Sequence, residues 1–392
     1  MNILFLLKDL NVGGVEIVSA VLANKFAEEG HKVTIWAFQK INKDISSRIN
    51  ENVTIVYGCG LRYSKENVKS LRDCIINNSI DVVIDQWALP YFVTRTLCKS
   101  VKGLKVRIIA VYHNNPESNG RLKGVEMELE KTSNPFKSSL LRLKYKAFKF
   151  ITSRSLRHTY NICDNFIVLS NSFIDGFKRF THISDTSKLR VLTNPVTLDT
   201  NDYVYDFESK EKEIIYCGRL DENQKRVSRI IDVWGLLEEK NPEWKLTFVG
   251  DGEERNNLEA ACKRMGLRRV FFEGFVSPIP YYKRASVLIL TSEYEGFPLV
   301  LAECMSFGVV PVVYGSYPAV YDIIDNEKNG MICYKSNDSF PHDEMSTLVQ
   351  KVIDDKDLRK KMSQTAIETS KSYDITEIYC KWRKLFKKLN NE

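Results

Sequence analysis

The segment "SEYEGFPLVLAECMSFGVVPVV", residues 292–313, places two glutamates, Glu295 and Glu303, on either side of a Gly-Phe-Pro turn. The apolar run just before it, "SVLILTS", predicts a buried strand, and the residues after the turn predict a helix. Pro298 suits the first position of that helix and Gly308 its end. "VVPVV" then predicts another strand. Strand, helix and strand in succession predict a right-handed unit of a parallel sheet.

The same alternation runs through the chain in two series. The first extends from "NILFLL" at residues 2–7 to "LRVLTNPV" at residues 189–196, and the second begins with "EIIYCGRL" at residue 213. Two series predict two doubly wound α/β domains, each with a ligand site at the carboxyl ends of its strands. The polar junction then separates an N-terminal domain, 1–197, from a C-terminal domain, 198–375. A last helix, 376–392, is expected to pack back on the first domain.

Composition excludes several classes of protein. A chain of 392 residues is long enough for two cores, and its nine cysteines are scattered with no C-x-x-C pair, which favours a reducing cytoplasm over a disulfide scaffold. The opening residues, "MNILFLLKDL", predict a first strand rather than a signal peptide. No apolar run approaches the roughly 20 residues that a membrane span needs.

The opening segment has the properties of a diphosphate-sugar site. The free N–H groups at the helix start, around Phe297, Leu299 and Val300, favour an anion such as phosphate. Glu295 in the preceding loop and Glu303 on the helix would repel that phosphate unless they point to hydroxyl groups, so sugar and ribose hydroxyls are the natural partners. Alternatively, Glu295 is a solvated loop residue and Glu303 a helix-surface charge; the spacing alone leaves both open.

Two further loops follow strands of the second domain. In "GRLDENQKRV", Arg219 and Lys225 can clamp a diphosphate, Arg219 through two parallel hydrogen bonds and Lys225 as a point charge. The alternative is a solvated charged loop. In "VGDGEE", Gly250 and Gly252 permit close approach of the backbone.

In the first domain, Gly13 and Gly14 open a helix after the first strand, without the third glycine of a dinucleotide-binding fingerprint. His113 follows the strand "RIIAVY", where a ligand is expected, although a lone histidine is more often structural. The single D-x-D match, Asp355 to Asp357, suits a helix start and is not expected to bind metal.

These segments resemble the retaining glycosyltransferases of the GT-B fold, specifically the nucleotide-sugar transferases of family four. The matching motifs cover nearly the whole chain in the family's order: "GGVE", "VYH", "FIVLS", "NPV", "GRL", "VGDG" and "EGFPLVLAE", with its Glu-x7-Glu pair. The resemblance implies two Rossmann-like domains facing across a cleft.

The resemblance also implies residue roles. Glu303 would bind the ribose, Glu295 the transferred sugar, and His113 would lie near C6 of that sugar. Arg219 and Lys225 would neutralise the diphosphate. The gap before Lys225 is one residue longer than in many relatives, so Arg226 is an alternative to it. The catalytic set is then His113, Glu295, Arg219 and Lys225, and the donor-binding set is Gly14, Gly250, Phe297, Pro298, Leu299, Val300 and Glu303.

The implied activity is transfer of a hexose or N-acetylhexosamine from a nucleotide diphosphate sugar, a UDP-sugar above all, to a saccharide or polyprenyl-linked saccharide in cell-surface polysaccharide synthesis. Family members are described as reacting by front-face displacement, with no metal or other cofactor and no nucleic acid partner. Two alternatives are a nucleotide-sugar 2-epimerase of the same fold and a non-catalytic sugar-nucleotide-binding protein. The "EGFPLVLAE" run argues against the epimerase, and the first-domain motifs argue against the non-catalytic protein.

Positive charge concentrates in "KSSLLRLKYKAFKFITSRSLR", residues 137–157, which holds seven Lys and Arg and no acidic residue. Leu140, Leu141, Leu143, Phe148 and Ile151 are interleaved with them, so a helix here would have basic and apolar faces. Such a helix either packs on the first sheet with a solvated basic side or lies on an anionic membrane. With a lipid-linked acceptor, the second reading predicts peripheral binding at the inner face of the cell membrane.

Overall fold

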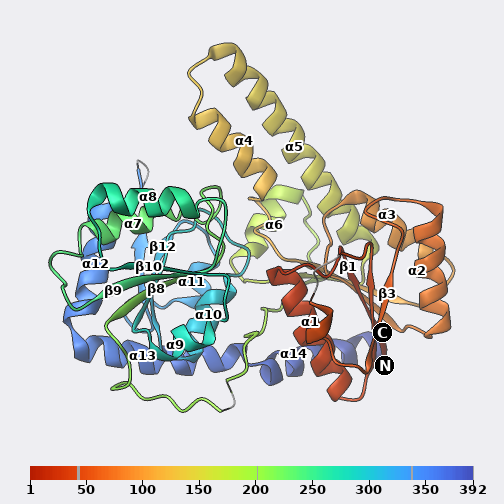
Figure 1. Ribbon diagram of the computed structural model, residues 1–392. Coiled ribbons are helices and arrows are strands. Elements are labelled where there is room, and N and C mark those ends of the chain that lie inside the picture. The colour runs from red at the N-terminus through yellow and green to blue at the C-terminus, as the bar shows by residue number, and fades with distance from the viewer. Residues whose placement is uncertain (42–44, 201, 337–338, 392) are drawn as a thin grey trace. The chain divides into compact units, whose positions relative to one another are not determined.

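A computed structural model describes residues 1–41, 45–200, 202–336 and 339–391 of the protein. The chain divides into two compact units, Met1–Thr197 with Ile375–Glu392, and Leu198–Asp374. Each unit is a parallel sheet covered by helices (Figure 1). The predicted fold class, two Rossmann-like α/β domains, is confirmed.

The sheet of unit 1 has the strand order β3-β2-β1-β4-β5-β6-β7. Its central strands are apolar on both faces because helices cover both sides, and the side chains of residues 3–7 are almost completely buried. The strands are β1 (Asn2–Leu7), β2 (Lys32–Ala37), β3 (Val53–Tyr57), β4 (Val82–Asp85), β5 (Arg107–Tyr112), β6 (Asn165–Val168) and β7 (Leu189–Val191).

The helices of unit 1 include a pair that the sequence only half predicted. Instead of one helix at 137–157, the structure has a hairpin of α4 and the 28-residue α5, which extends away from the sheet (Figure 1). Among the described residues, no helix has the length and apolar character needed to cross a bilayer. The helices are α1 (Gly14–Glu28), η1 (Ser46–Arg48), α2 (Lys65–Asn77), α3 (Tyr91–Ser100), α4 (Gly120–Glu130), α5 (Pro135–Ile162) and α6 (Phe173–Thr181).

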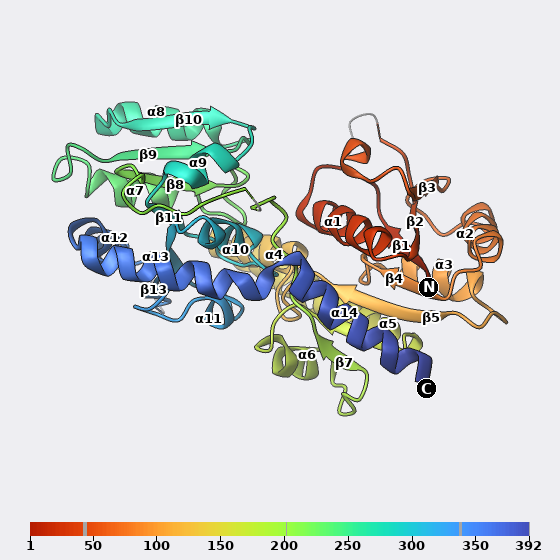
Figure 2. The same ribbon diagram turned by 90° about the horizontal axis from the view of Figure 1, so that it is seen from below.

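The last helix, α14 (Ile375–Asn391), belongs to unit 1 and packs on α1. Phe26 of α1 meets the rings of Tyr379, Trp382 and Phe386, with centroid distances of 5.5–5.8 Å. The ring of His31 adds a 3.1 Å hydrogen bond to the hydroxyl of Tyr379. An aromatic cluster therefore holds the end of the chain against its beginning. The chain passes from α13 (Lys356–Ser370) through the short η2 (Lys371–Tyr373) into α14 (Figure 2).

The sheet of unit 2 has the strand order β10-β9-β8-β11-β12-β13. The strands are β8 (Glu213–Cys217), β9 (Lys245–Val249), β10 (Val270–Gly274), β11 (Val287–Leu290), β12 (Val310–Gly315) and β13 (Met331–Tyr334). The helices are α7 (Ser228–Gly235), α8 (Arg255–Met265), α9 (Ile279–Arg284), α10 (Leu299–Ser306), α11 (Val320–Ile323), α12 (His342–Asp354), α13 (Lys356–Ser370) and η2 (Lys371–Tyr373). Because β8 and β11 are neighbours, the loops that follow them emerge side by side.

Candidate active site

The loops after β8 and β11 meet in a nearly buried ion pair. Nζ of Lys225 lies 2.6 Å from Oε1 of Glu295, and the two side chains are only 16% and 7% exposed. Nε2 of Gln224 donates to the other carboxylate oxygen of Glu295 at 2.9 Å. The backbone is also tied, because Oγ1 of Thr291 donates to the carbonyl of Arg226 at 3.0 Å. The structure therefore brings two of the four predicted catalytic residues into direct contact.

Asp221 organises the loop that carries Lys225. Its Oδ1 accepts the backbone N–H of Gln224 at 2.7 Å, and its Oδ2 accepts Nε of Arg219 at 2.7 Å. Burial alone would raise the pKa of Asp221, but these donors outweigh it and the pKa is lowered. The Arg219 side chain is 67% exposed, so its guanidinium is accessible to an anion while Asp221 orients it.

Close approach of the loops after β8 and β9 explains the glycines of "VGDG". A Cβ on Gly250 would lie 1.9 Å from the carbonyl oxygen of Gly218, and one on Gly252 would lie 2.2 Å from that of Leu220. Gly250 also has a φ of +144°, which L side chains rarely adopt. The predicted close approach is confirmed, and the backbone that approaches is the protein's own "GRL" loop.

Helix α10 begins one residue later than the sequence predicted. Pro298 is its N-cap rather than its first residue, and the helix runs over Leu299–Ser306. Phe297 is buried and packs against Tyr373 at a centroid distance of 5.5 Å. The first backbone N–H groups of an α-helix, here those of Leu299 and Val300, have no acceptor within the helix, so they can donate to a ligand.

Glu303 lies in the second turn of α10. Burial raises the pKa of the Cys217 thiol to about 12, and the negative charge of Glu303 contributes to that rise. Since Cys217 ends β8, the carboxylate of Glu303 acts at the same edge of the sheet as the "GRL" loop. Both glutamates of the opening motif thus belong to the carboxyl edge of one sheet.

The remaining predicted site residues belong to unit 1. Gly13 is the N-cap of α1 and Gly14 its first residue, so both follow β1. His113 follows β5, and its Nε2 lies 2.6 Å from Oε1 of Gln86. Burial lowers the pKa of His113 to about 4, so the ring is neutral at pH 7 and Nε2 carries the proton that it donates to Gln86. Nδ1 is then an acceptor.

Asp85, at the end of β4, is a fully buried carboxyl group that directly precedes Gln86. Its Oδ1 accepts the backbone N–H of Trp87 at 3.0 Å, while its Oδ2 has no hydrogen-bond partner among the described residues. Burial raises the pKa of Asp85 to about 7. The carboxyl group therefore stays protonated in the folded protein well above the pH at which it ionises in the unfolded chain.

This shift predicts a pH dependence of stability. The unfolded carboxyl loses its proton near pH 4, whereas the folded one keeps it to about pH 7, so the contribution of Asp85 to stability falls as pH rises between these values. From pH 5 to pH 8, this group should lower the free energy of unfolding of the wild type by roughly 2–3 kcal/mol. Asp85→Asn, which cannot ionise, should not show this decrease. Urea unfolding of the wild type and the variant at both pH values measures it. Parallel pH profiles for the two proteins would contradict the shift.

Sequence reasoning missed Gln224, Asp85 and Gln86. Gln224 directly precedes Lys225 in a loop already identified, so its position was the available signal. Asp85 is the last residue of β4 and Gln86 follows it, so their place at the carboxyl end of a strand was the signal for them. Arg226, the alternative to Lys225, has a φ of +51° and a buried Nε without a hydrogen-bond partner among the described residues. Asp355 of the D-x-D match caps α13 by accepting the N–H of Leu358 at 2.8 Å, as its predicted place at a helix start requires.

Two family models together match residues 12–369. The model described as Glycosyltransferase Family 4 matches residues 12–200, and the one described as Glycosyl transferases group 1 matches residues 199–369. The border between them falls within three residues of the border between the two structural units.

One similar protein matches the whole chain, and another matches less than half of it. A Campylobacter jejuni enzyme named as an α-1,4-N-acetyl-D-galactosaminyltransferase acting on a diNAcBac-PP-undecaprenol-linked glycan is 26% identical, over 100% of this chain and 99% of its own length. The amylovoran biosynthesis glycosyltransferase AmsD of Erwinia amylovora is 30% identical over 45% of this chain and 48% of its own length.

Solved structures share the fold. The pneumococcal O-GlcNAc transferase GtfA, in complex with UDP and GlcNAc, superposes with a TM-score of 0.75 at 12% identity, covering 100% of this chain and 99% of that one. Anabaena HepE in complex with UDP-glucose gives 0.75 at 16% identity, covering 99% and 100%. Glycosyltransferase family models match both halves of the chain, and the solved structures share its fold. The chain therefore belongs to family 4 of the glycosyltransferases and is of the GT-B type.

Proposed function

We propose that the protein transfers a hexose or N-acetylhexosamine from a UDP-sugar, with retention of the anomeric configuration, to a saccharide or lipid-linked saccharide used in cell-surface polysaccharide synthesis. The observation that carries this proposal is the nearly buried Lys225–Glu295 pair at the carboxyl edge of the unit 2 sheet. A carboxylate at that edge can accept hydrogen bonds from sugar hydroxyls, and its partner amine can contact a phosphate. The UDP complexes of similar folds and the undecaprenol-linked substrate named for the Campylobacter relative support the two substrate classes.

The donor would be held by side chains and backbone N–H groups of unit 2. Glu303 accepts the ribose hydroxyls, and Glu295 accepts hydroxyls of the transferred sugar. Arg219 and Lys225 neutralise the diphosphate, Arg219 from an exposed position and Lys225 while it also contacts Glu295. The first-turn N–H groups of α10, beside Phe297 and Pro298, complete the phosphate contacts. The roles that the resemblance implies for Gly14 and His113 of unit 1 stay predictions.

The reaction would be a front-face displacement. The acceptor hydroxyl oxygen forms a bond to the anomeric carbon on the face from which the diphosphate leaves, the bond between that carbon and the phosphate oxygen breaks, and the acceptor proton passes to a β-phosphate oxygen. No protein nucleophile is needed. The protein positions the reactants and stabilises the negative charge that develops on the leaving diphosphate.

Turnover of the donor tests this function. The purified chain should hydrolyse or transfer the sugar of at least one UDP-sugar, and NMR of the initial product should show the anomeric configuration of the donor. Binding of UDP-sugars without any turnover would favour a non-catalytic sugar-nucleotide-binding protein. Formation of a sugar epimer would favour a 2-epimerase, and an inverted product would refute retention.

Activity should survive chelation of divalent metal by EDTA. Since Arg219 and Lys225 supply the positive charge that a metal ion supplies in other transferases, Arg219→Ala should lower kcat/KM more than EDTA does. Removing one such charge from the developing diphosphate typically lowers the rate by about 10²–10³. Steady-state rates with EDTA, and with added Mg²⁺ or Mn²⁺ after dialysis, measure both effects. A strict metal requirement would overturn the assignment of the clamp.

A further inference from the structure

The outer face of α5 carries a stripe of large apolar side chains. The stripe consists of residues 136, 140, 143, 150 and 151, and the exposed fractions are 82% for Phe136, 59% for Leu140, 65% for Leu143, 66% for Phe150 and 56% for Ile151. At about 100° of rotation per residue, all five fall within an arc of roughly 100°. Contiguous exposed apolar side chains of this size usually mark a docking surface.

The opposite face of α5 accounts for the folding of the hairpin. Leu141 is 5% exposed, and the hydroxyl of Tyr145 donates to Glu126 of α4 at 2.9 Å. The sequence predicted an apolar face that includes Leu141 and Phe148, but Leu141 is buried and Phe148 half-buried, whereas Phe136 and Phe150 are exposed. The stripe is therefore not part of the core of the hairpin, and another role must explain it.

Charge on the hairpin is strongly biased. Residues 120–162 contain ten Lys and Arg and three Glu, a net charge of +7, which equals the net charge of the whole chain. The rest of the protein is thus neutral in sum. Of the seven basic side chains on α5, Lys144 alone has an ion-pair partner within the described parts of the chain, Glu128 at 3.6 Å. A cationic helix face with an apolar stripe is complementary to an anionic lipid surface.

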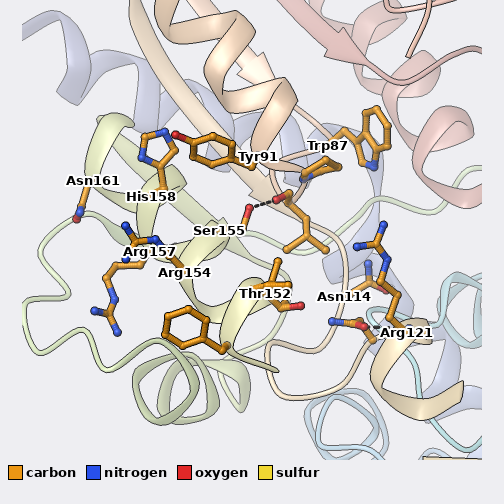
Figure 3. A pocket seen from close by; sticks show the side chains of 16 residues that line it. Trp87, Tyr91, Asn114, Arg121, Thr152, Arg154, Ser155, Arg157, His158 and Asn161 are labelled. Carbon is orange, nitrogen blue, oxygen red and sulfur yellow. Dashed lines mark hydrogen bonds between the residues drawn. The ribbon is translucent and has the colours of Figure 1, made fainter. Parts of the chain in front are cut away.

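A cavity of about 940 Å³ lies at the base of α5, where the stripe ends. Phe150 and Ile151 of the stripe line it, together with residues of α3, α4 and the loops after β4 and β5. Arg121, Arg154, Arg157 and His158 also line it, and none of the described lining residues is Asp or Glu. Figure 3 shows Arg154 and Arg157 on one side and Arg121 and Asn114 on the other, with Thr152 between them.

The cavity is a defined structure rather than a gap between loose loops. The guanidinium of Arg157 is held by two hydrogen bonds to the carbonyl of Thr181, at 2.9 and 2.6 Å. Ser155 donates to the carbonyl of Leu89, and the rings of Tyr91 and His158 pack at a centroid distance of 4.9 Å. Arg121 and Arg154 form no ion pair with the described residues, so their charge is available to an anion.

We propose that α5 lies on an anionic membrane with its stripe in the boundary between headgroups and acyl chains, and that the cavity binds the phosphate group of a lipid in that membrane. One amphiphile explains both features, because an apolar surface leads directly into a cationic cavity. The stripe argues against a nucleic acid ligand, whose phosphates would meet the basic residues but not five apolar side chains. That this lipid is the lipid-linked acceptor rests on the proposed function, whereas the membrane contact and the phosphate site do not.

Vesicle co-sedimentation of the full chain tests the stripe. Wild type should sediment with vesicles of phosphatidylcholine and phosphatidylglycerol, and only weakly with phosphatidylcholine alone. Phe136→Ser/Leu140→Ser/Leu143→Ser should lower the partition coefficient by at least about tenfold, since these side chains supply the inserted apolar area. Ile76→Ser/Val204→Ser, which removes exposed apolar side chains elsewhere, is the matched control. A wild type that stays in the supernatant at low salt, or a control as defective as the stripe variant, overturns the docking surface.

Binding of a soluble lipid diphosphate tests the cavity. Farnesyl diphosphate is titrated in the presence of saturating UDP, which occupies the donor site, and inorganic diphosphate is titrated in parallel. Wild type should bind farnesyl diphosphate at least about tenfold more tightly than inorganic diphosphate, and Arg121→Gln/Arg154→Gln should lose this binding by a similar factor. Arg142→Gln/Lys149→Gln, on α5 outside the cavity lining, should not. Equal affinity for both probes overturns the lipid assignment, and binding that the cavity variant leaves unchanged overturns the site.

Donor hydrolysis in vesicle-free buffer separates this inference from the proposed function. The stripe variant should hydrolyse the donor at the wild-type rate, because the residues proposed to bind the donor lie elsewhere. Vesicle binding by a wild type with no donor turnover would refute the proposed function and leave the docking surface standing. Donor turnover without vesicle binding would do the reverse.

Discussion

Lys225→Ala is expected to remove most of the activity and to destabilise the fold. Glu295 is 7% exposed, so loss of its cation leaves a carboxylate with little solvent and, among the described residues, only the amide of Gln224 as a donor. Breaking a buried pair by removing one partner costs about 3–5 kcal/mol. Loss of the cation at the diphosphate should lower kcat/KM by about 10²–10³. Urea unfolding and steady-state kinetics on the same preparation measure the two effects.

The double variant Lys225→Met/Glu295→Gln separates stability from catalysis. Neutralising both members of the pair removes the uncompensated charge, and replacements of similar volume are often tolerated at buried ion pairs. We expect the double variant to recover most of the stability that Lys225→Ala loses, but none of the activity. Full activity in Lys225→Ala would refute the catalytic role of the pair. Failure of the double variant to recover stability would show that the pair is not the source of the destabilisation.

Glu303→Ala is expected to weaken binding of UDP. Two hydrogen bonds from the ribose hydroxyls to a charged acceptor are lost, each worth about 1.5–3 kcal/mol, which together correspond to roughly 10²–10⁴ in affinity. Isothermal titration of the variant with UDP measures the loss. Glu303→Gln keeps the shape of the side chain with a neutral acceptor. Its affinity for UDP should lie between those of the wild type and Glu303→Ala. An unchanged affinity for UDP would refute the ribose assignment.

A comparison of UDP with 2′-deoxy-UDP locates the contact on the nucleotide. Wild type should prefer UDP, since the 2′-hydroxyl donates to Glu303, and the alanine variant should lose this preference. Glu295→Gln serves as the matched comparison within the same motif, because Glu295 is proposed to contact the sugar and not the ribose. It should keep the preference for UDP while lowering donor turnover. Loss of the preference in both variants would point to a general disturbance of the site.

The sequence by itself determined the architecture of each domain. Buried parallel strands are apolar on both faces, so local patterns such as "NILFLL" and "SVLILTS" were sufficient. The sequence also predicted turns, because glycine is needed where the backbone approaches closely or φ is positive. Gly250 and Gly308 both have a positive φ. The joint order of short motifs identified the family. The start of α10 was misplaced by one residue, because proline suits either side of a helix start.

Only the tertiary structure decided which side chains meet. Lys225 and Glu295 are 70 residues apart, and they pair because β11 lies beside β8 in the sheet. Strand order depends on long-range contacts that leave no local periodicity. The exposed face of α5 was undetermined for the same reason: the helix has apolar residues on two sides, and the packing of α4 against Leu141 and Tyr145 decided which side remained exposed. Burial then set the charge states of Asp85 and His113, since desolvation depends on every element packed around them.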